Sequence, residues 1–123
     1  MAHLLVIEDD ELIRKYLRQA LEDAGHEVDT ATNGREGAAA FRRKPADLII
    51  TDIFMPESDG LEVILQMKRD NPSVRIIAMS GGGARVGNFD FLSVAESFGA
   101  AATLKKPFST HELFDAINKA LAG

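Results

Sequence analysis

The sequence has 123 residues, of which 46% are hydrophobic, with no cysteine and a net charge of −5. This length is enough for one domain with its own core, and the lack of cysteine excludes disulfides and thiolate metal sites. The acidic balance argues against direct nucleic-acid binding, and the early apolar run from Leu4 to Ile7 is too short for a secretory signal or a membrane span. We therefore expect a cytoplasmic protein without nucleic-acid or membrane contacts.

Short runs rich in β-branched residues alternate with segments whose hydrophobic residues recur every three or four positions. The first pattern predicts strands and the second predicts amphipathic helices. The five predicted strands lie, in chain order, at residues 3–8, 27–31, 48–53, 74–79 and 101–105. Strict alternation of such strands with helices predicts an α/β fold, a doubly wound parallel five-stranded sheet. The common flavodoxin-like strand order for five such units is 2-1-3-4-5.

Helix boundaries carry their own signals. An oxygen-bearing residue followed three positions later by glutamate is typical of a helix N-terminus, and glycine is typical of the position after a helix. The capping pairs are Asn33 with Glu36, Asp59 with Glu62 and Ser109 with Glu112, and the terminating glycines are Gly25 and Gly99.

Charged and hydroxyl residues lie at the ends of four of the predicted strands. They are Glu8 and Asp9 at the end of the first strand, Asp52 at the end of the third, Ser80 at the end of the fourth and Lys106 at the end of the fifth. In a sheet of this order, ligands bind beyond the carboxyl ends of strands 1 and 3, where the winding reverses. Acids from strands ~4.8 Å apart repel each other, so they either take up protons or are neutralised by Lys106 and a divalent cation. Oxygen ligands without histidine or cysteine favour a hard cation, with Mg²⁺ as the leading candidate.

Asp52 is the best-placed nucleophile of this group. An aspartate can attack phosphorus and form an acyl phosphate. The developing charge on the phosphoryl oxygens would be neutralised by Mg²⁺ and the Lys106 ammonium, with a hydroxyl donated by Ser80. The residues thus predict a phosphoacceptor site.

Over its whole length the chain resembles a response-regulator receiver domain of two-component signalling. Four motifs carry the resemblance: the acidic pair Glu8-Asp9, the phosphoacceptor loop Asp52-Ile-Phe-Met-Pro56 with Asp59-Gly60, the switch hydroxyl Ser80, and Lys106-Pro107-Phe108. The family pattern implies that Asp9 and Asp52 ligate Mg²⁺ directly, that Glu8 acts mainly through water and that the Phe54 carbonyl adds a ligand. It also implies that Asp10 caps the first helix and that the Lys106–Pro107 bond is cis.

The same resemblance implies how the chain functions. A histidine kinase or histidine phosphotransfer protein would phosphorylate Asp52 in a phosphorelay, and the domain would catalyse only its own phosphorylation and slow dephosphorylation. Phosphorylation would draw Ser80 inward and change the face formed by helix 4, strand 5 and helix 5, which signals to a downstream effector protein. We expect a monomer or an activation-dependent dimer, with residues 1–123 forming a single stand-alone receiver without an output domain.

The sequence departs from the family pattern at three positions. Thr103 occupies the place where receivers often have a switch tyrosine or phenylalanine. The segment from Gly81 to Phe89 is long and rich in glycine, which predicts a mobile backbone. Phe54 is apolar and is expected to shield the acyl phosphate from water.

Three other functions remain as alternatives. A non-phosphorylated binding module of the same fold would use its helix faces without Asp52 chemistry. A flavodoxin-like cofactor carrier would need a neutral, hydroxyl-rich loop after the first strand, and the acids from Glu8 to Glu11 would repel its phosphate. An aspartate-based phosphatase would place its nucleophile at the end of the first strand with a second aspartate two residues on, a pattern that this sequence lacks.

Overall fold

The central element is a sheet of five parallel strands, in a computed structural model that describes residues 2–55, 58–81, 85–86 and 89–122, with side chains described outside 54–60 and 82–91. The strands are β1 (His3–Ile7), β2 (Glu27–Ala31), β3 (Leu48–Asp52), β6 (Arg75–Ser80) and β9 (Ala102–Lys105). Their order is β2-β1-β3-β6-β9, and every neighbouring pair is parallel. This confirms the predicted order 2-1-3-4-5.

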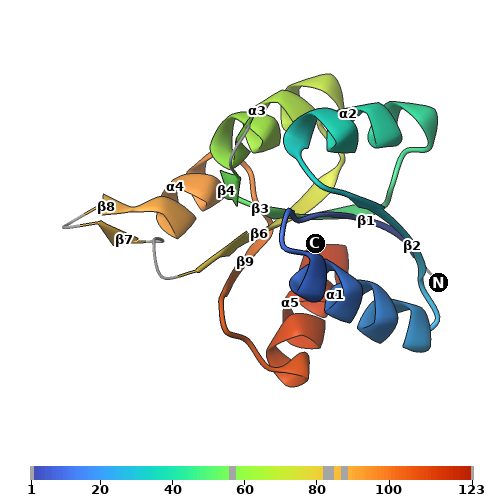
Figure 1. The fold of residues 1–123 in the computed structure, drawn as a ribbon. Coiled ribbons are helices and arrows are strands. Elements are labelled where there is room, and N and C mark those ends of the chain that lie inside the picture. The colour runs from blue at the N-terminus through green and yellow to red at the C-terminus, as the bar shows by residue number, and fades with distance from the viewer. Residues whose placement is uncertain (1, 56–57, 82–84, 87–88, 123) are drawn as a thin grey trace.

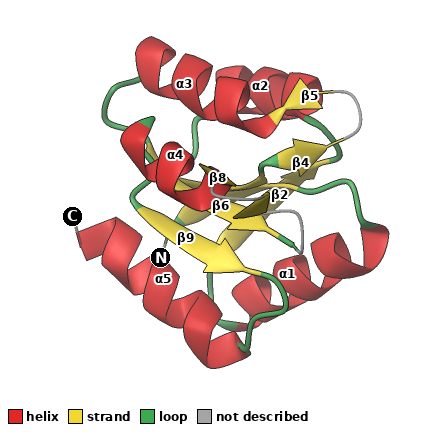
Figure 2. Cartoon of the chain, turned by 90° about the vertical axis from the view of Figure 1, so that its left-hand side faces the viewer, coloured by secondary structure: helices red, strands yellow, loops and turns green. Residues whose placement is uncertain are grey.

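Helices cover both faces of the sheet. They are α1 (Glu11–Asp23), α2 (Gly34–Arg43), α3 (Gly60–Asp70), α4 (Phe91–Ser97) and α5 (Thr110–Ala122). Figures 1 and 2 show α1 and α5 on one face and α2, α3 and α4 on the other. The result is a three-layer α/β architecture, as the alternation of strands and helices predicts.

The core is divided by the period of two along each strand. In β1, Leu4 and Val6 join the cluster under α1 and α5, whereas Leu5 and Ile7 join the cluster under α2, α3 and α4. All four side chains are buried. Both faces of β1 are therefore apolar because both are covered.

The predicted helix caps are largely confirmed. Asp10 accepts a hydrogen bond from the Ile13 N–H at 3.1 Å, and Asn33 accepts one from the Glu36 N–H at 2.9 Å. Ser109 and Glu112 form a reciprocal capping box, and Gly25 and Gly99 have positive φ angles of 94° and 113° after their helices. Asp59 directly precedes α3, and Glu62 lies in its first turn. The side chain of Asp59 lies outside the described part of the structure, so this cap stays a prediction.

Some strand boundaries differ by one residue from the prediction. β1 ends at Ile7 and β3 at Asp52, whereas β6 runs from Arg75 to Ser80. Glu8 still donates its N–H to the Ala31 carbonyl at 3.0 Å, but it has no partner in the pairing register of β1, because the chain turns toward α1.

Two short antiparallel pairs were not predicted. β4 (Phe54–Met55) pairs with β5 (Ser58–Asp59), and β7 (Arg85–Val86) pairs with β8 (Phe89–Asp90). Residues 82–84 and 87–88 lie outside the described residues, so the mobility expected for the glycine-rich segment stays a prediction. In the described residues, no helix has both the length and the hydrophobicity needed to cross a bilayer.

Candidate functional site

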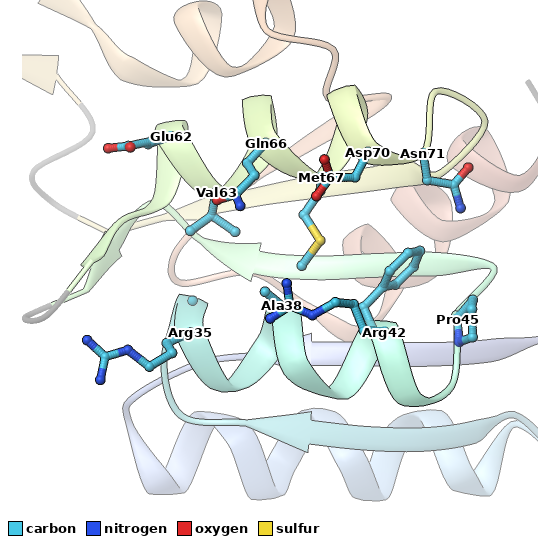
Figure 3. Close-up of a pocket in the computed structure, with 12 residues that line it drawn as sticks. Arg35, Ala38, Arg42, Pro45, Glu62, Val63, Gln66, Met67, Asp70 and Asn71 are labelled. Atoms are coloured by element: carbon cyan, nitrogen blue, oxygen red, sulfur yellow. The ribbon is translucent and has the colours of Figure 1, made fainter.

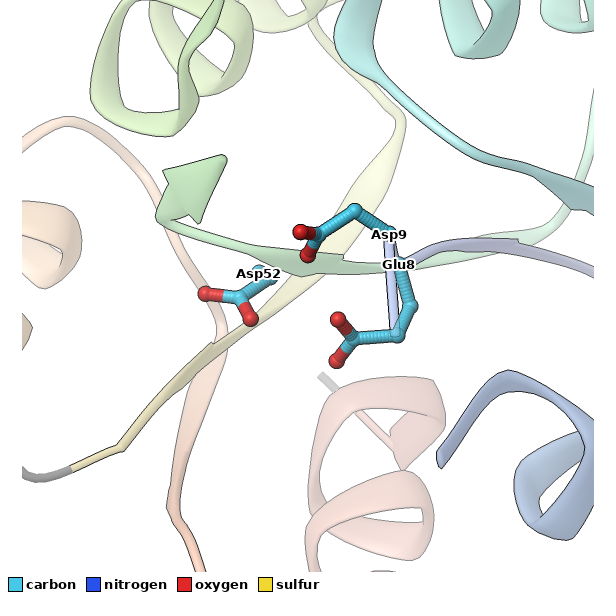
Figure 4. A group of neighbouring side chains, drawn as sticks. All are labelled: Glu8, Asp9 and Asp52. Carbon is cyan, nitrogen blue, oxygen red and sulfur yellow. The ribbon is translucent and has the colours of Figure 1, made fainter. Parts of the chain in front are cut away.

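Three carboxylates meet at the carboxyl edge of the sheet. Glu8 and Asp9 follow β1, and Asp52 ends the neighbouring strand β3. One oxygen of each lies within 4.8 Å of the other two, and Figure 4 shows Glu8 and Asp9 approaching Asp52 from the two sides of the strand end. Glu8 is 0% exposed and Asp52 is 5% exposed, whereas Asp9 is exposed. The structure thus brings together the three acids that the sequence places at strand ends.

Lys106 joins two of these acids. Its Nζ lies 2.6 Å from Glu8 Oε1 and 2.6 Å from Asp52 Oδ2. Its N–H donates to the Ser80 carbonyl at 2.7 Å, and the Lys106–Pro107 bond is cis, as predicted. The preceding residue, Lys105, is exposed, and neighbouring side chains of a strand alternate between its two faces.

The burial of these charges changes their ionisation. Burial raises the pKa of Glu8 from 4.5 to about 6, against the opposing effect of hydrogen bonds from Lys106 and from the Asp10 N–H. Burial alone would lower the pKa of Lys106, but hydrogen bonds to Asp52 and Glu8 outweigh it and raise that pKa. The lysine therefore remains the pocket's own positive charge.

Ser80 contributes a buried hydroxyl to the same edge. Its side chain is 0% exposed, and its Oγ has no hydrogen-bond partner among the described residues. An unsatisfied buried hydroxyl costs about 1–3 kcal/mol, so a bound ligand with an acceptor oxygen would account for its presence. Thr103 lies half-buried, and no aromatic side chain takes that position.

The donor set suits a hard divalent cation. Three carboxylate oxygens within 4.8 Å of one another, without histidine or cysteine, match the oxygen ligands that Mg²⁺ prefers. The role of the Phe54 carbonyl as a further ligand stays a prediction. The Phe54 side chain lies outside the described residues, and so does its expected shielding role.

An apolar hollow of about 500 Å³ adjoins Lys106. Its lining comes from α1, from the residue after β6 and from the loop after β9, and consists of Leu12, Ile13, Tyr16, Gly81, Lys106, Pro107 and Phe108. Leu12 is 79% exposed, and the Tyr16 hydroxyl lies 2.7 Å from Thr110 Oγ1. An exposed leucine beside a charged pocket is a feature that the sequence analysis did not single out.

A larger groove of about 650 Å³ lies between α2 and α3, away from the acids (Figure 3). Phe41 and Met67 are buried in its floor, and Arg35 and Glu62 extend from opposite helices at one end. None of the predicted site residues lines it. The groove is therefore separate from the acidic pocket.

One side chain that contacts the site was missed by the sequence analysis. Arg14 Nη1 lies 2.8 Å from the Glu8 carbonyl and 3.3 Å from the Asp9 carbonyl. The available signal was its position one turn into α1, directly after the acidic pair. Unlike a helix cap, this bond from a side chain to the main chain follows no recognised residue pattern, so sequence inspection passes over it.

Comparisons with known proteins agree with this geometry. The family model for the response regulator receiver domain matches residues 4–118. The response regulator receiver protein CpdR of Brucella abortus is 34% identical over 121 residues, covering 98% of each chain. The DNA-binding transcriptional regulator NtrC of Azospirillum brasilense is 39% identical over 120 residues, covering 98% of this chain but only 24% of NtrC.

Solved structures show the same fold. A response regulator receiver domain protein from Clostridium thermocellum has a TM-score of 0.90 and 32% identity, over 99% of this chain and 95% of that one. The chemotaxis protein CheY4 of Vibrio cholerae has a TM-score of 0.86 and 28% identity, over 98% of this chain and 99% of that one. The chain belongs to the response regulator receiver family. Receiver domains are phosphoacceptor signalling modules of two-component systems and bind Mg²⁺ at an acidic pocket.

Proposed function

We propose that this chain accepts a phosphoryl group on Asp52 from the phosphohistidine of a histidine kinase or histidine phosphotransfer protein, in a Mg²⁺-dependent reaction. Glu8, Asp9, Asp52 and the Phe54 carbonyl would hold the ion, with Glu8 acting mainly through water. The observation that carries the proposal is the Lys106 ammonium, 2.6 Å from both Glu8 and Asp52 at a strand edge that also holds the unsatisfied hydroxyl of Ser80.

The chemistry is an attack by a carboxylate oxygen of Asp52 on phosphorus. A bond forms between that oxygen and phosphorus while the phosphorus–nitrogen bond breaks, and the leaving imidazole nitrogen keeps the electron pair. Lys106 faces the negative charge of the phosphoryl oxygens, and Ser80 supplies a hydroxyl that can donate to one of them. When bound, Mg²⁺ supplies further charge neutralisation and a template for the phosphoryl group.

The apolar hollow beside Lys106 supports a protein as the phosphoryl donor. Leu12 is 79% exposed and lies with Tyr16, Pro107 and Phe108 next to the acids. Exposed apolar surface rimmed by polar groups marks sites of protein contact. A donor protein seated there would bring its phosphohistidine to Asp52.

The deciding experiment is incubation with acetyl phosphate and Mg²⁺, followed by intact-mass measurement. We expect one phosphoryl adduct on the wild type, none on Asp52→Asn, and an unchanged adduct on Asp70→Asn, an exposed aspartate at the end of α3 that serves as the control. A folded wild type without an adduct would instead support the non-phosphorylated binding module.

Output is proposed to pass through the elements next to Ser80. Engagement of the Ser80 hydroxyl by the phosphoryl group would shift the segment leading to α4 between two populations and so change the face of α4, β9 and α5 that contacts an effector protein. NMR spectra before and after phosphorylation test this, because chemical shifts in α4 that stay unchanged would exclude it. Light scattering on the same samples reports whether the monomer becomes a dimer.

A further inference from the structure

Arg14 hydrogen-bonds to three consecutive carbonyl groups. Its guanidinium Nη1 lies 2.8 Å from the carbonyl oxygen of Glu8 and 3.3 Å from that of Asp9. Its backbone N–H donates to the carbonyl of Asp10 at 2.9 Å. The last of these is the first backbone bond of α1, and the two side-chain bonds of this half-buried residue reach the main chain of the turn between β1 and α1.

The choice of partners is informative because carboxylates surround this arginine. The four residues from Glu8 to Glu11 are all acidic. The ion pairs formed within the described residues nevertheless include none to Arg14. The hydrogen bonds that its side chain makes within the described residues go to main-chain oxygens, which indicates a role in fixing the turn rather than in neutralising the acids.

These carbonyls need a donor other than the backbone N–H groups of the strands and helices. The pairing of β1 with β2 and β3 ends at Ile7, and α1 begins at Glu11. The carbonyls of Glu8 and Asp9 therefore belong to neither a strand ladder nor a helix. A partly buried carbonyl without a partner is costly, and one guanidinium nitrogen, Nη1, contacts both carbonyl oxygens.

Asp9 depends most on this arrangement. Glu8 and Asp52 are each held by Lys106, but the Asp9 carboxylate makes no hydrogen bond or ion pair that the described part of the chain records. Its direction is consequently set by its main chain. We propose that Arg14 is a positioning residue that fixes this main chain, so that Asp9 faces the metal pocket before a cation binds. The inference rests on the proposed function, because the cation is the one that function requires.

The direction in which Mg²⁺ affinity changes in one variant distinguishes a positioning role of Arg14 from a purely electrostatic one. Arg14→Met removes a positive charge close to the acids, and on charge alone this would make Mg²⁺ bind more tightly. If Arg14 positions Asp9, the same change makes Mg²⁺ bind less tightly, by about tenfold, the low end for residues that support metal ligands. Titration calorimetry with MgCl₂ on the unphosphorylated protein measures this affinity.

Two further variants complete the test. Arg14→Lys keeps the charge but replaces the planar guanidinium with an ammonium on a different stem, so its affinity for Mg²⁺ should fall between those of wild type and Arg14→Met. Arg18→Met removes a charge one turn further along α1, where the side chain contacts Glu22 instead, and should leave the affinity within about twofold of wild type. Urea unfolding shows whether each variant is folded, and Arg14→Lys decides alone if Arg14→Met is not.

A second readout needs no metal. The Asp10 N–H donates to Glu8 Oε2 at 3.1 Å, and its hydrogen exchange in EDTA should be faster in Arg14→Met than in wild type or Arg18→Met. Equal or tighter Mg²⁺ binding by Arg14→Met, or unchanged exchange at Asp10, would overturn the inference. A wild type that binds no Mg²⁺ would overturn the proposed function instead, and the exchange rates would still decide the role of Arg14.

Discussion

Ser80 and Thr51 are two buried hydroxyl residues that differ in their hydrogen bonding. Thr51 Oγ1 donates to the Asp52 carbonyl at 3.1 Å, whereas Ser80 Oγ is unsatisfied within the described residues. We expect Ser80→Ala to stabilise the unphosphorylated protein by about 1 kcal/mol, because it removes a desolvated group that has no partner. The same variant should take up the phosphoryl group more slowly, since a donor to the phosphoryl oxygens is lost.

Urea unfolding and the rate of adduct formation measure the two effects. Thr51→Val is the matched control for stability and should lose about 1 kcal/mol, because its hydroxyl is bonded. Loss of stability in Ser80→Ala would show that the hydroxyl is satisfied in solution.

Glu8 makes the stability of the metal-free protein depend on pH. Burial raises its pKa in the folded state to about 6, above the ordinary value of 4.5. Between these values the folded state binds more protons than the unfolded state, so the Glu8 contribution to stability falls as pH rises through this window, by about 1–2 kcal/mol. Unfolding of wild type and Glu8→Gln in EDTA from pH 4 to 7 measures the contribution as a difference.

Glu36 provides a control of opposite sign. Hydrogen bonds from Thr32 lower the pKa of Glu36, so its contribution to stability is present at neutral pH and is lost as pH falls through the lowered value. Glu36→Gln should therefore change the dependence of the free energy of unfolding on pH in the opposite direction to Glu8→Gln. If the plots of unfolding free energy against pH are parallel for wild type and Glu8→Gln, the raised pKa of Glu8 is contradicted.

The residues that carry chemistry were predictable because strand ends in a parallel sheet converge. Glu8 and Asp9 follow one apolar run, Asp52 ends a second and Lys106 follows a third. The common strand order brings these three strand ends together. The contacts that each of these residues makes were harder to predict from the sequence. The bridging position of Lys106 between two acids and the unsatisfied state of Ser80 depend on side-chain geometry that no spacing encodes.

At the scale of elements, α2 packs unusually close to β1. A Cβ added at Gly37 would lie 2.3 Å from Ile7 Cδ1 and 2.7 Å from Ile7 Cγ1, so only glycine permits this approach. We expect Gly37→Ala to destabilise the protein by about 1–3 kcal/mol through overpacking, although alanine favours helices by about 1 kcal/mol over glycine.

Thermal or urea unfolding measures the effect, and a double variant locates its cause. Ile7→Val removes the Cδ1 atom that the new methyl group would meet. In that background the cost of Gly37→Ala should shrink, whereas independent sites would give additive losses. Equal costs in both backgrounds would show that the contact with Ile7 is not responsible.

The five strands of the main sheet were predicted within about one residue because each is long enough to recognise in the sequence. The pairs β4–β5 and β7–β8 were missed because each strand has two residues, too few for any period to appear. Strand order is likewise not a property of any single segment. It was obtained from the usual winding of five βα units, and the pairing of β1 with both β2 and β3 confirms it.

For the whole molecule, a cation that binds only the folded state adds to its stability. We expect Mg²⁺ at ten times its dissociation constant to raise the free energy of unfolding by about 1.4 kcal/mol. Asp9→Asn should reduce this gain at the same Mg²⁺ concentration, because it weakens one of three convergent ligands. Urea unfolding with and without MgCl₂ measures it.

Asp47→Asn is the matched control, since Asp47 accepts a hydrogen bond from the His3 N–H at the opposite edge of the sheet. Mg²⁺ should raise the free energy of unfolding of Asp47→Asn by as much as that of the wild type, even though the variant is less stable without Mg²⁺. An equal increase in Asp9→Asn would place the cation elsewhere.

The hollow that contains Tyr16 gives the protein a built-in optical reporter. The chain has one tyrosine and no tryptophan, so its near-ultraviolet emission comes almost entirely from that single ring. The ring lines the same hollow as Lys106, and its hydroxyl is bonded to Thr110 at the start of α5. Any event that moves Lys106 or the first turn of α5 should therefore change the tyrosine fluorescence intensity of the unlabelled protein. The binding of a ligand at the pocket can then be followed in real time without a dye.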